Sequence, residues 1–239
     1  MADTKQLKNR IDFIDALRGI AIILMILHHF FYDLTVFTDV PDRIFRNDVF
    51  NVIQIVSAGT FVVLCGVSSR LSRSNIKRGL ITLAAATIIS VVTYFMDMPI
   101  VFGVLQLLSF CMLFYGVTGK LWDLIPRWLM PVLTVAGAVV SDWCVNNIEV
   151  QSKNLWILGW TYKGFVSYDY FPLFPWIFIF LFGTWAGYYV KEHRLPEKFY
   201  TVRIPVLPKI GRLSLIIYMI HQPILYGITM VIKQIMNNM

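Results

Sequence analysis

Residues 14–34 read IDALRGIAIILMILHHFFYDL, a segment long and apolar enough to cross a lipid bilayer as one α-helix. The acidic and basic side chains within this segment are Asp15, Arg18, His28, His29 and Asp33. Ionisable groups inside the hydrocarbon layer are energetically costly and usually serve a function. We therefore expect the rest of the chain to be arranged around this helix.

The ionisable side chains are not scattered around the helix. At about 100° per residue, Asp15, Arg18, His29 and Asp33 fall within roughly 60° of one another, whereas His28 lies about 100° from His29. Arg18 and His29 are separated by about 16 Å along the axis, which places an arginine near one interface and a deep imidazole on the same face. The pattern predicts a functional site at His29. The alternative is that Arg18 reaches lipid phosphates and the histidines only hydrogen-bond to neighbouring helices.

The composition indicates an integral membrane protein, because 57% of the 239 residues are hydrophobic and only 15% are charged. We predict an all-α, polytopic transmembrane bundle in the cell membrane, forming a single domain over residues 1–239. Its seven apolar segments are approximately 14–37, 50–70, 79–96, 100–119, 128–146, 172–190 and 212–235.

The basic residues predict the orientation of the bundle. With the N-terminus in the cytoplasm, 16 of the 21 Lys and Arg residues fall on the cytoplasmic side and 5 on the other side. We therefore expect a cytoplasmic N-terminus and an outer C-terminus. The same rule accounts for the net charge of +7 without a nucleic-acid partner. Cys65, Cys111 and Cys144 show no spacing typical of metal ligands, so we expect no metal site.

The second apolar segment ends in a dense basic cluster that includes Arg70 and Arg73. Guanidinium groups can grip phosphate oxygens with two parallel hydrogen bonds, so this cluster could hold a phosphorylated cofactor. The alternative is an ordinary anchor to lipid headgroups.

Polar residues also occur at the predicted outer ends of the helices and in the last span. Gln106 opens the fourth segment, facing a partner helix or a cavity, and Asp169 lies in an aromatic loop that could bind a sugar ring or only mark the interface. In the last segment, Tyr218 and His221 lie on a second polar stripe with Ser214 and Gln222. Two such stripes can meet, which strengthens a functional interpretation of His29.

Several motifs follow one another along nearly the whole chain, namely DALRGIAIILM at 15–25, GVLQ at 103–106, YD at 168–169 and FGTWAG at 182–187. Together they resemble the catalytic domain of heparan-α-glucosaminide N-acetyltransferase and its bacterial relatives. The first helix is also similar to that of integral membrane acyltransferases that modify bacterial polysaccharides, in which ten residues separate an arginine from a histidine, as in Arg18 and His29 here. SLIIYMIHQP at 214–223 is similar to the last-helix motif of both groups.

The chain departs in three ways from heparan-α-glucosaminide N-acetyltransferase, which is a lysosomal enzyme. That enzyme has its catalytic histidine in the loop after the first helix, whereas residues 38–48 contain none here. Leu107 stands where an arginine commonly follows the GVLQ motif, and the chain has fewer spans. The catalytic role is therefore assigned to His29 from the arginine–histidine spacing of the bacterial acyltransferases alone.

The resemblance implies transfer of an acetyl or other short acyl group from cytosolic acyl-CoA to a hydroxyl or amine of a sugar or glycan at the outer face. His29 is then expected to take the acceptor's proton, because imidazole titrates near neutral pH. Asp33 would orient the ring, and Gln106, Tyr218 or the catalytic His221 would donate to the developing oxyanion. The CoA phosphates are assigned to Arg18, Arg70 and Arg73, and the substrate contacts to Gln106, Asp169 and Tyr218.

The main alternative is a small-solute or proton-coupled transporter, in which the buried His, Arg and Asp side chains form a relay. Against this function, the seven segments show no inverted repeat and only one clear helix broken by proline. The expected partners are membrane lipids and the acyl acceptor. A homodimer is also left open, because seven spans are few to enclose a site.

Overall fold

The computed structural model describes residues 10–38, 40, 41, 43, 45, 47–150 and 152–238. This part of the chain is all-α, with no strand beyond an isolated bridge between Phe102 and Tyr170. Seven of its helices are long and apolar enough to cross a membrane, which confirms the predicted multi-pass integral membrane fold. They are α2 (Asp12–Phe37), α3 (Asp48–Leu71), α4 (Asn75–Phe95), α5 (Val104–Trp122), α6 (Leu129–Asn147), α7 (Leu173–Lys191) and α10 (Ser214–Asn237).

The chain divides into two compact units, which we describe separately. The first contains residues 1–61 and 195–239, and the second contains residues 62–194. The first unit therefore includes α2, α10 and two short helices, α8 (Glu197–Thr201) and α9 (Leu207–Arg212). The second unit includes α4 to α7, and α3 contributes its first part to one unit and its second part to the other.

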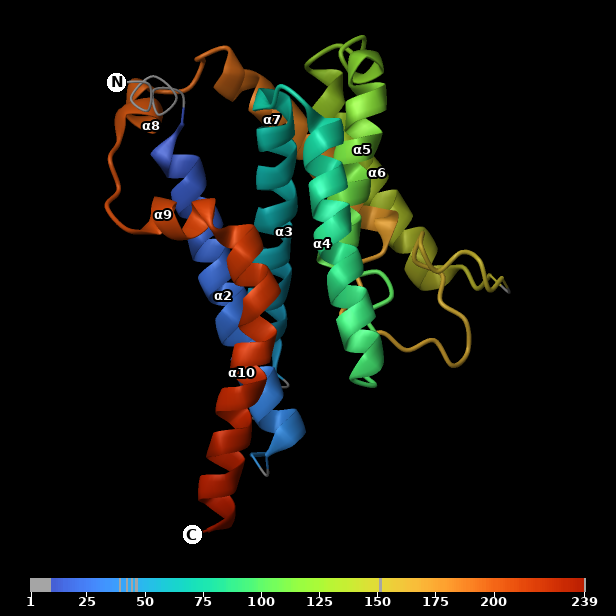
Figure 1. Cartoon of the computed structure of the whole chain (residues 1–239). Helices are drawn as coiled ribbons and strands as arrows, with labels where there is room; N and C mark the ends of the chain where they lie inside the picture. Colours follow the sequence, from blue (N-terminus) through green and yellow to red (C-terminus); the bar gives the residue numbers. More distant parts are fainter. Residues whose placement is uncertain are drawn as a thin grey trace. The chain divides into compact units, whose positions relative to one another are not determined.

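In the first unit, α2 and α10 lie side by side and run in the same direction (Figure 1). Their contacts follow the order of both helices, since His29 meets His221, Asp33 meets Gln222 and Phe37 meets Tyr226. Two helices that run in parallel place their C-terminal ends at the same end of the unit. This arrangement brings the two polar stripes together.

A close crossing of α9 over the beginning of α2 depends on two glycines. A Cβ atom at Gly211 would overlap the carbonyl oxygen of Asp15, and one at Gly19 would overlap the carbonyl oxygen of Leu207. Only a residue without a side chain allows the two backbones to approach this closely. The crossing fixes the position of Arg212, at the end of α9, beside α2.

In the second unit, α7 packs tightly against the second part of α3. Gly183 and Gly187 of α7 and Gly66 of α3 each face the backbone of the opposite helix, so a Cβ atom at any of them would cause a clash. The spacing of Gly183 and Gly187 predicts such a close helix approach, and the structure confirms it.

The fourth span begins four residues later than its predicted start at residue 100. Residues 99–103 are not helical because their backbone pairs with the loop before α7: Tyr168 N–H donates to the carbonyl of Pro99, and Phe171 N–H donates to that of Phe102. Gly103 then caps α5. A long-range pairing of this kind leaves no signal in local hydrophobicity.

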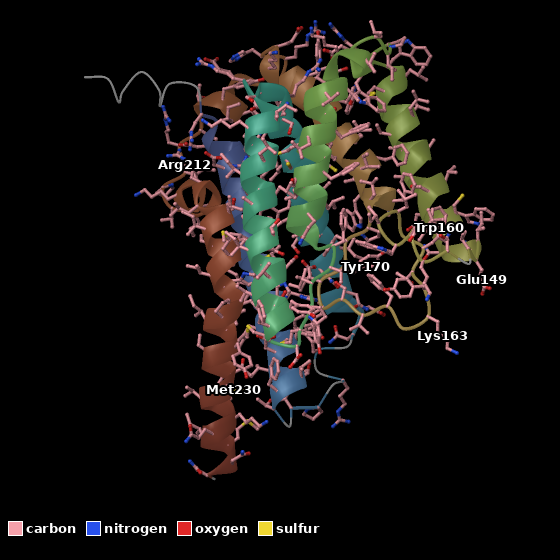
Figure 2. All side chains as sticks on the ribbon, turned by 45° about the vertical axis from the view of Figure 1, so that its right-hand side comes forward. Glu149, Trp160, Lys163, Tyr170, Arg212 and Met230 are labelled. Atoms are coloured by element: carbon pink, nitrogen blue, oxygen red, sulfur yellow. The ribbon has the colours of Figure 1, made fainter. Side chains whose placement is uncertain are left out.

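Basic residues concentrate at one end of the second unit. The end with the α3–α4, α5–α6 and α7 termini carries Arg70, Arg73, Lys77, Arg78, Lys120, Arg127, Lys191 and Arg194. The other end carries only Lys153 and Lys163, in the loop that also holds Trp160 and Tyr170 (Figure 2). The side of the membrane that each end faces stays a prediction. Three of the basic residues counted for that prediction, Lys5, Lys8 and Arg46, lie outside the described residues.

Candidate functional site

The two polar stripes of the first unit meet at a pair of histidines. The ring of His29 on α2 lies 5.1 Å from the ring of His221 on α10, measured between centroids. Tyr218, one turn before His221, places its ring 5.3 Å from that of His221. The structure thus brings together three of the residues that the sequence predicts for the site.

The hydrogen bonding of His221 determines which of its ring nitrogens carries the proton. Nδ1 lies 2.6 Å from the carbonyl oxygen of Tyr218, which can only accept a hydrogen bond. Nδ1 must therefore donate, and in the neutral ring Nε2 is an acceptor with a lone pair. Nε2 is buried and has no hydrogen-bond partner among the described residues. A neutral ring is favoured because a cationic one would bury a second, unpaired N–H donor.

Asp33 is fully buried one turn beyond His29 and is held by Gln222 of α10. The amide of Gln222 donates to both carboxylate oxygens of Asp33, at 2.9 and 3.0 Å. The carboxylate is thus fixed by a residue outside the predicted site set, although Gln222 belongs to the predicted stripe of α10. The amide oxygen of Gln222 is buried and, within the described part of the chain, lacks a partner.

His28 lies next to the pair but has different surroundings. Its ring packs edge-on against Phe45 with the centroids 5.0 Å apart, and it is 5.7 Å from the ring of His29. His28 is therefore a natural reference residue for His29, with the same chemistry on a different face of α2.

Arg18 lies in a network of ion pairs at the beginning of α2. It donates to one oxygen of Asp15 at 2.7 Å, and Arg212 donates to the other at 3.1 Å. Arg212 also pairs with Asp12 at 2.8 Å. The sequence does not reveal these partnerships, because Arg212 and Asp15 are 197 positions apart. The local sequence hints at these ion pairs only through the acidic residues in the first turn of α2.

Arg70 and Arg73 are at the basic end of the second unit. Arg70 donates to the hydroxyl of Tyr115 at 2.7 Å and forms an ion pair with Asp123. Arg73 is exposed. Asp123 follows the end of α5 and Gln106 lies in its first turn, so Arg70 and Gln106 are about 25 Å apart along α5.

Gln106 and Asp169 meet at the opposite end of the second unit, where they build the beginning of α5. The amide oxygen of Gln106 accepts from Gly103 N–H at 3.0 Å, and its nitrogen donates to the hydroxyl of Ser90 at 2.7 Å. The Asp169 carboxylate accepts from Val104 N–H at 3.2 Å, as expected for an anion at a helix N-terminus. Two motifs of the resemblance, GVLQ and YD, thus converge in a structural junction.

No group of three or more His, Cys, Asp or Glu side chains in the described ranges could hold a metal ion. The histidine pair and Asp33 offer two imidazoles and a fixed carboxylate as reactive groups. One imidazole nitrogen is a buried acceptor, which suits proton transfer or nucleophilic attack.

A comparison with protein families gives a match over most of the chain. The family described as "Heparan-alpha-glucosaminide N-acetyltransferase, catalytic" matches residues 10–223. No curated protein and no solved structure matches the chain. The family match includes both histidines of the pair and the junction of Gln106 and Asp169.

Proposed function

Because the chain belongs to the heparan-α-glucosaminide N-acetyltransferase catalytic family, we propose that it is a membrane-embedded acyltransferase. Acetyl-CoA, or another short acyl-CoA, is the proposed donor. The acceptor is a hydroxyl or amine of a sugar or glycan at the outer face. The observation that carries the proposal is the close pair of His29 and the buried His221, on two membrane-spanning helices.

His29 is the proposed general base of the transfer. As the acceptor oxygen or nitrogen attacks the thioester carbonyl, its proton passes to the imidazole of His29. The tetrahedral intermediate then collapses, the C–S bond breaks, and the imidazolium returns the proton to the sulfur of CoA. A general base in this position typically contributes about 10²–10⁴-fold to the rate. An acyl-histidine intermediate is the second route, and a burst of CoA release without acceptor would identify it.

His221 and Asp33 support the base. His221 is one of three residues that the sequence offers as an oxyanion donor, and in its neutral ring Nε2 is an acceptor. We instead propose that Nε2 accepts a hydrogen bond from the substrate or from His29 as charge develops. Asp33, held by Gln222, adds a negative charge one helical turn from His29 that favours the imidazolium.

The remaining predicted residues take positioning roles in the proposal. Arg70 and Arg73 bind the CoA phosphates at the cytoplasmic face, and Arg18 contributes positive charge at the beginning of α2. Tyr218 contacts the acceptor beside His221. Asp169 ties the loop before α7 to the beginning of α5, which Gln106 caps, and the aromatic residues of that loop offer stacking faces to a sugar ring.

Release of CoA thiol by the purified protein tests the proposal. The detergent-solubilised protein is given acetyl-CoA with and without amino sugars, and free thiol is followed with a thiol reagent. We expect acceptor-dependent release that is lost in His29→Ala and retained in His28→Ala. Absence of release with every acceptor, together with no stabilisation of the protein by acetyl-CoA against heating, would refute the proposal.

A transporter would behave differently in the same experiment. Solute transport needs two separated compartments, whereas acyl transfer proceeds in detergent. Uptake of a solute by vesicles that depends on His29, without thiol release, would favour the transporter.

A further inference from the structure

An arginine cluster surrounds one tyrosine ring at the basic end of the second unit. The guanidinium carbons of Arg127, Arg70 and Arg194 lie 3.9, 5.5 and 5.9 Å from the ring centroid of Tyr188. All three are within the range of cation–π attraction. The three residues come from the α5–α6 turn, the end of α3 and the segment after α7, so no local sequence pattern predicts their meeting.

The acidic residues of this Tyr188 cluster do not balance its arginines. Arg70 pairs with Asp123, and Arg194 pairs with Glu192 at 3.2 Å. The Tyr188 hydroxyl lowers the pKa of Glu192, and the charges of Arg194 and Arg127 lower it further. Three guanidinium groups therefore face two carboxylates, and the cluster has an excess positive charge.

Arg70 is held in place within this cluster, whereas Arg127 and Arg194 are exposed and accessible to a ligand. The indole N–H of Trp185 donates to the carbonyl of Arg127 at 2.9 Å, which fixes the backbone beside the ring. Arg70 is held by Tyr115 and Asp123, and its Nε is buried without a hydrogen-bond partner among residues that the structure describes. Arg70, which is held by two partners and partly desolvated, loses less entropy on binding a phosphate oxygen than a mobile guanidinium group does.

We infer that Arg127, Arg194 and Arg70, arranged around Tyr188, form a binding site for a phosphate-bearing ligand. The inference rests on the proposed function for its main candidate, the 3′-phosphate and diphosphate of acyl-CoA. It extends that proposal by adding Arg127, Arg194 and Tyr188. The phosphate of an anionic lipid headgroup has the same chemistry, and the experiment separates the two sources.

Binding of CoA to the purified full-length protein, measured by titration calorimetry in neutral detergent, tests the site. The test variant is Arg127→Gln/Arg194→Gln, which leaves Arg70 in place so that Asp123 keeps its partner. The control, Lys153→Gln/Lys163→Gln, removes the same charge from the other end of the same unit. Loss of charge-assisted hydrogen bonds to phosphate should raise the dissociation constant for CoA about 10- to 100-fold in the test variant, and less than about twofold in the control.

The source of the phosphate is decided by repeating the titration in vesicles of phosphatidylglycerol and of phosphatidylcholine. If anionic headgroups occupy the site, CoA binds the wild type more weakly in phosphatidylglycerol, and this difference disappears in the test variant. If the site binds soluble cofactor alone, the test variant weakens CoA binding equally in both lipids. Unchanged CoA binding and unchanged lipid competition in the test variant would overturn the inference.

A donor without phosphate separates this inference from the proposed function. The test variant should show a raised KM for acetyl-CoA but an unchanged rate with S-acetylpantetheine, which lacks the nucleotide. If neither donor supports transfer in the wild type, the proposed function fails, and the CoA titration still decides the phosphate site. If transfer occurs and the KM for acetyl-CoA is the same in the wild type and the test variant, the phosphate site is wrong and the acyltransferase stands.

Discussion

The histidine pair of the first unit and the Gln106–Asp169 junction of the second unit use their polar groups differently. In the junction, both ends of the Gln106 amide are hydrogen-bonded, and Asp169 caps α5. In the histidine pair, Nε2 of His221 and the amide oxygen of Gln222 are buried without partners in the described structure. Buried polar groups are normally paired, so an unpaired acceptor calls for a specific explanation.

The comparison distinguishes two reasons for polar residues in apolar segments. In the junction, the polar side chains fix a helix end and a loop. Gln106 and Asp169 already have hydrogen-bond partners there, which accounts for their presence by structure alone. In the histidine pair, Nε2 of His221 is an acceptor without a donor among the described residues, as expected for a group that meets its partner only during a reaction. The contrast agrees with the chemistry proposed for His29 and His221 and with a structural role for Gln106 and Asp169.

The largest expected effect is that of His29→Ala. Removal of the proposed base should lower kcat for acyl transfer by about 10²–10⁴-fold, with no change in membrane insertion. The measurement is thiol release from acetyl-CoA, with His28→Ala as the neighbouring control. Transfer at the wild-type rate in His29→Ala would remove the chemistry from this pair.

His221→Asn tests the unpaired acceptor itself. The asparagine amide can still donate to the Tyr218 carbonyl, as Nδ1 does, but it has no counterpart of Nε2. We expect kcat to fall about 10- to 100-fold, while the melting temperature stays close to that of the wild type. An unchanged kcat would show that Nε2 takes no part in the reaction.

The fold was predictable because each span is a long apolar run whose length is set by the bilayer. The start of α5 was not, because Gly103 and Val104 are fixed by side chains of Gln106 and Asp169. The second of these comes from a loop 65 positions away. Hydropathy reports burial in lipid and is insensitive to such capping.

The candidate site was predictable only up to the faces of its helices. The angular position of His29 on α2 follows from the helical period, and so does the stripe of α10. The pairing of Asp33 with Gln222 depends on how far α10 is shifted along α2, and the two residues are 189 positions apart. Nothing in the local sequence specifies that shift. The close crossing of α9 over α2 at Gly19 and Gly211 helps to set it.

Gln222→Leu should destabilise the first unit. Asp33 would lose the amide that donates to both of its oxygens, and an unsatisfied buried acceptor costs about 1–3 kcal/mol. Denaturant unfolding of the purified protein measures the change. In Asp33→Leu/Gln222→Leu both polar groups are gone, so part of the loss should be recovered. If the double variant is less stable than Gln222→Leu by the full cost of Asp33→Leu alone, the pairing has no energetic role.

Gln106→Leu should affect stability and leave the chemistry intact. The variant removes hydrogen bonds to Gly103 and Ser90, each of which contributes about 1 kcal/mol to folding. We expect a lower melting temperature and kcat within about twofold of the wild type. A large fall in kcat at unchanged stability would restore the substrate-binding role predicted from the sequence and break the contrast between the two regions.

The smallest expected effect is a pH dependence in the loop that carries Asp169. Burial raises the pKa of Tyr170 from 10.0 to about 12, and its hydroxyl donates to the carbonyl of Trp156 at 2.5 Å. Since the pKa is raised in the folded state, the neutral hydroxyl stabilises the loop fully below pH 10, and this contribution is lost as the pH rises through about 12. Tyrosinate absorbance of the wild type should therefore show one more group titrating near pH 12 than that of Tyr170→Phe. If the group that Tyr170→Phe removes titrates near pH 10 instead, Tyr170 is solvated, and the junction is less completely paired than the contrast with the histidines requires.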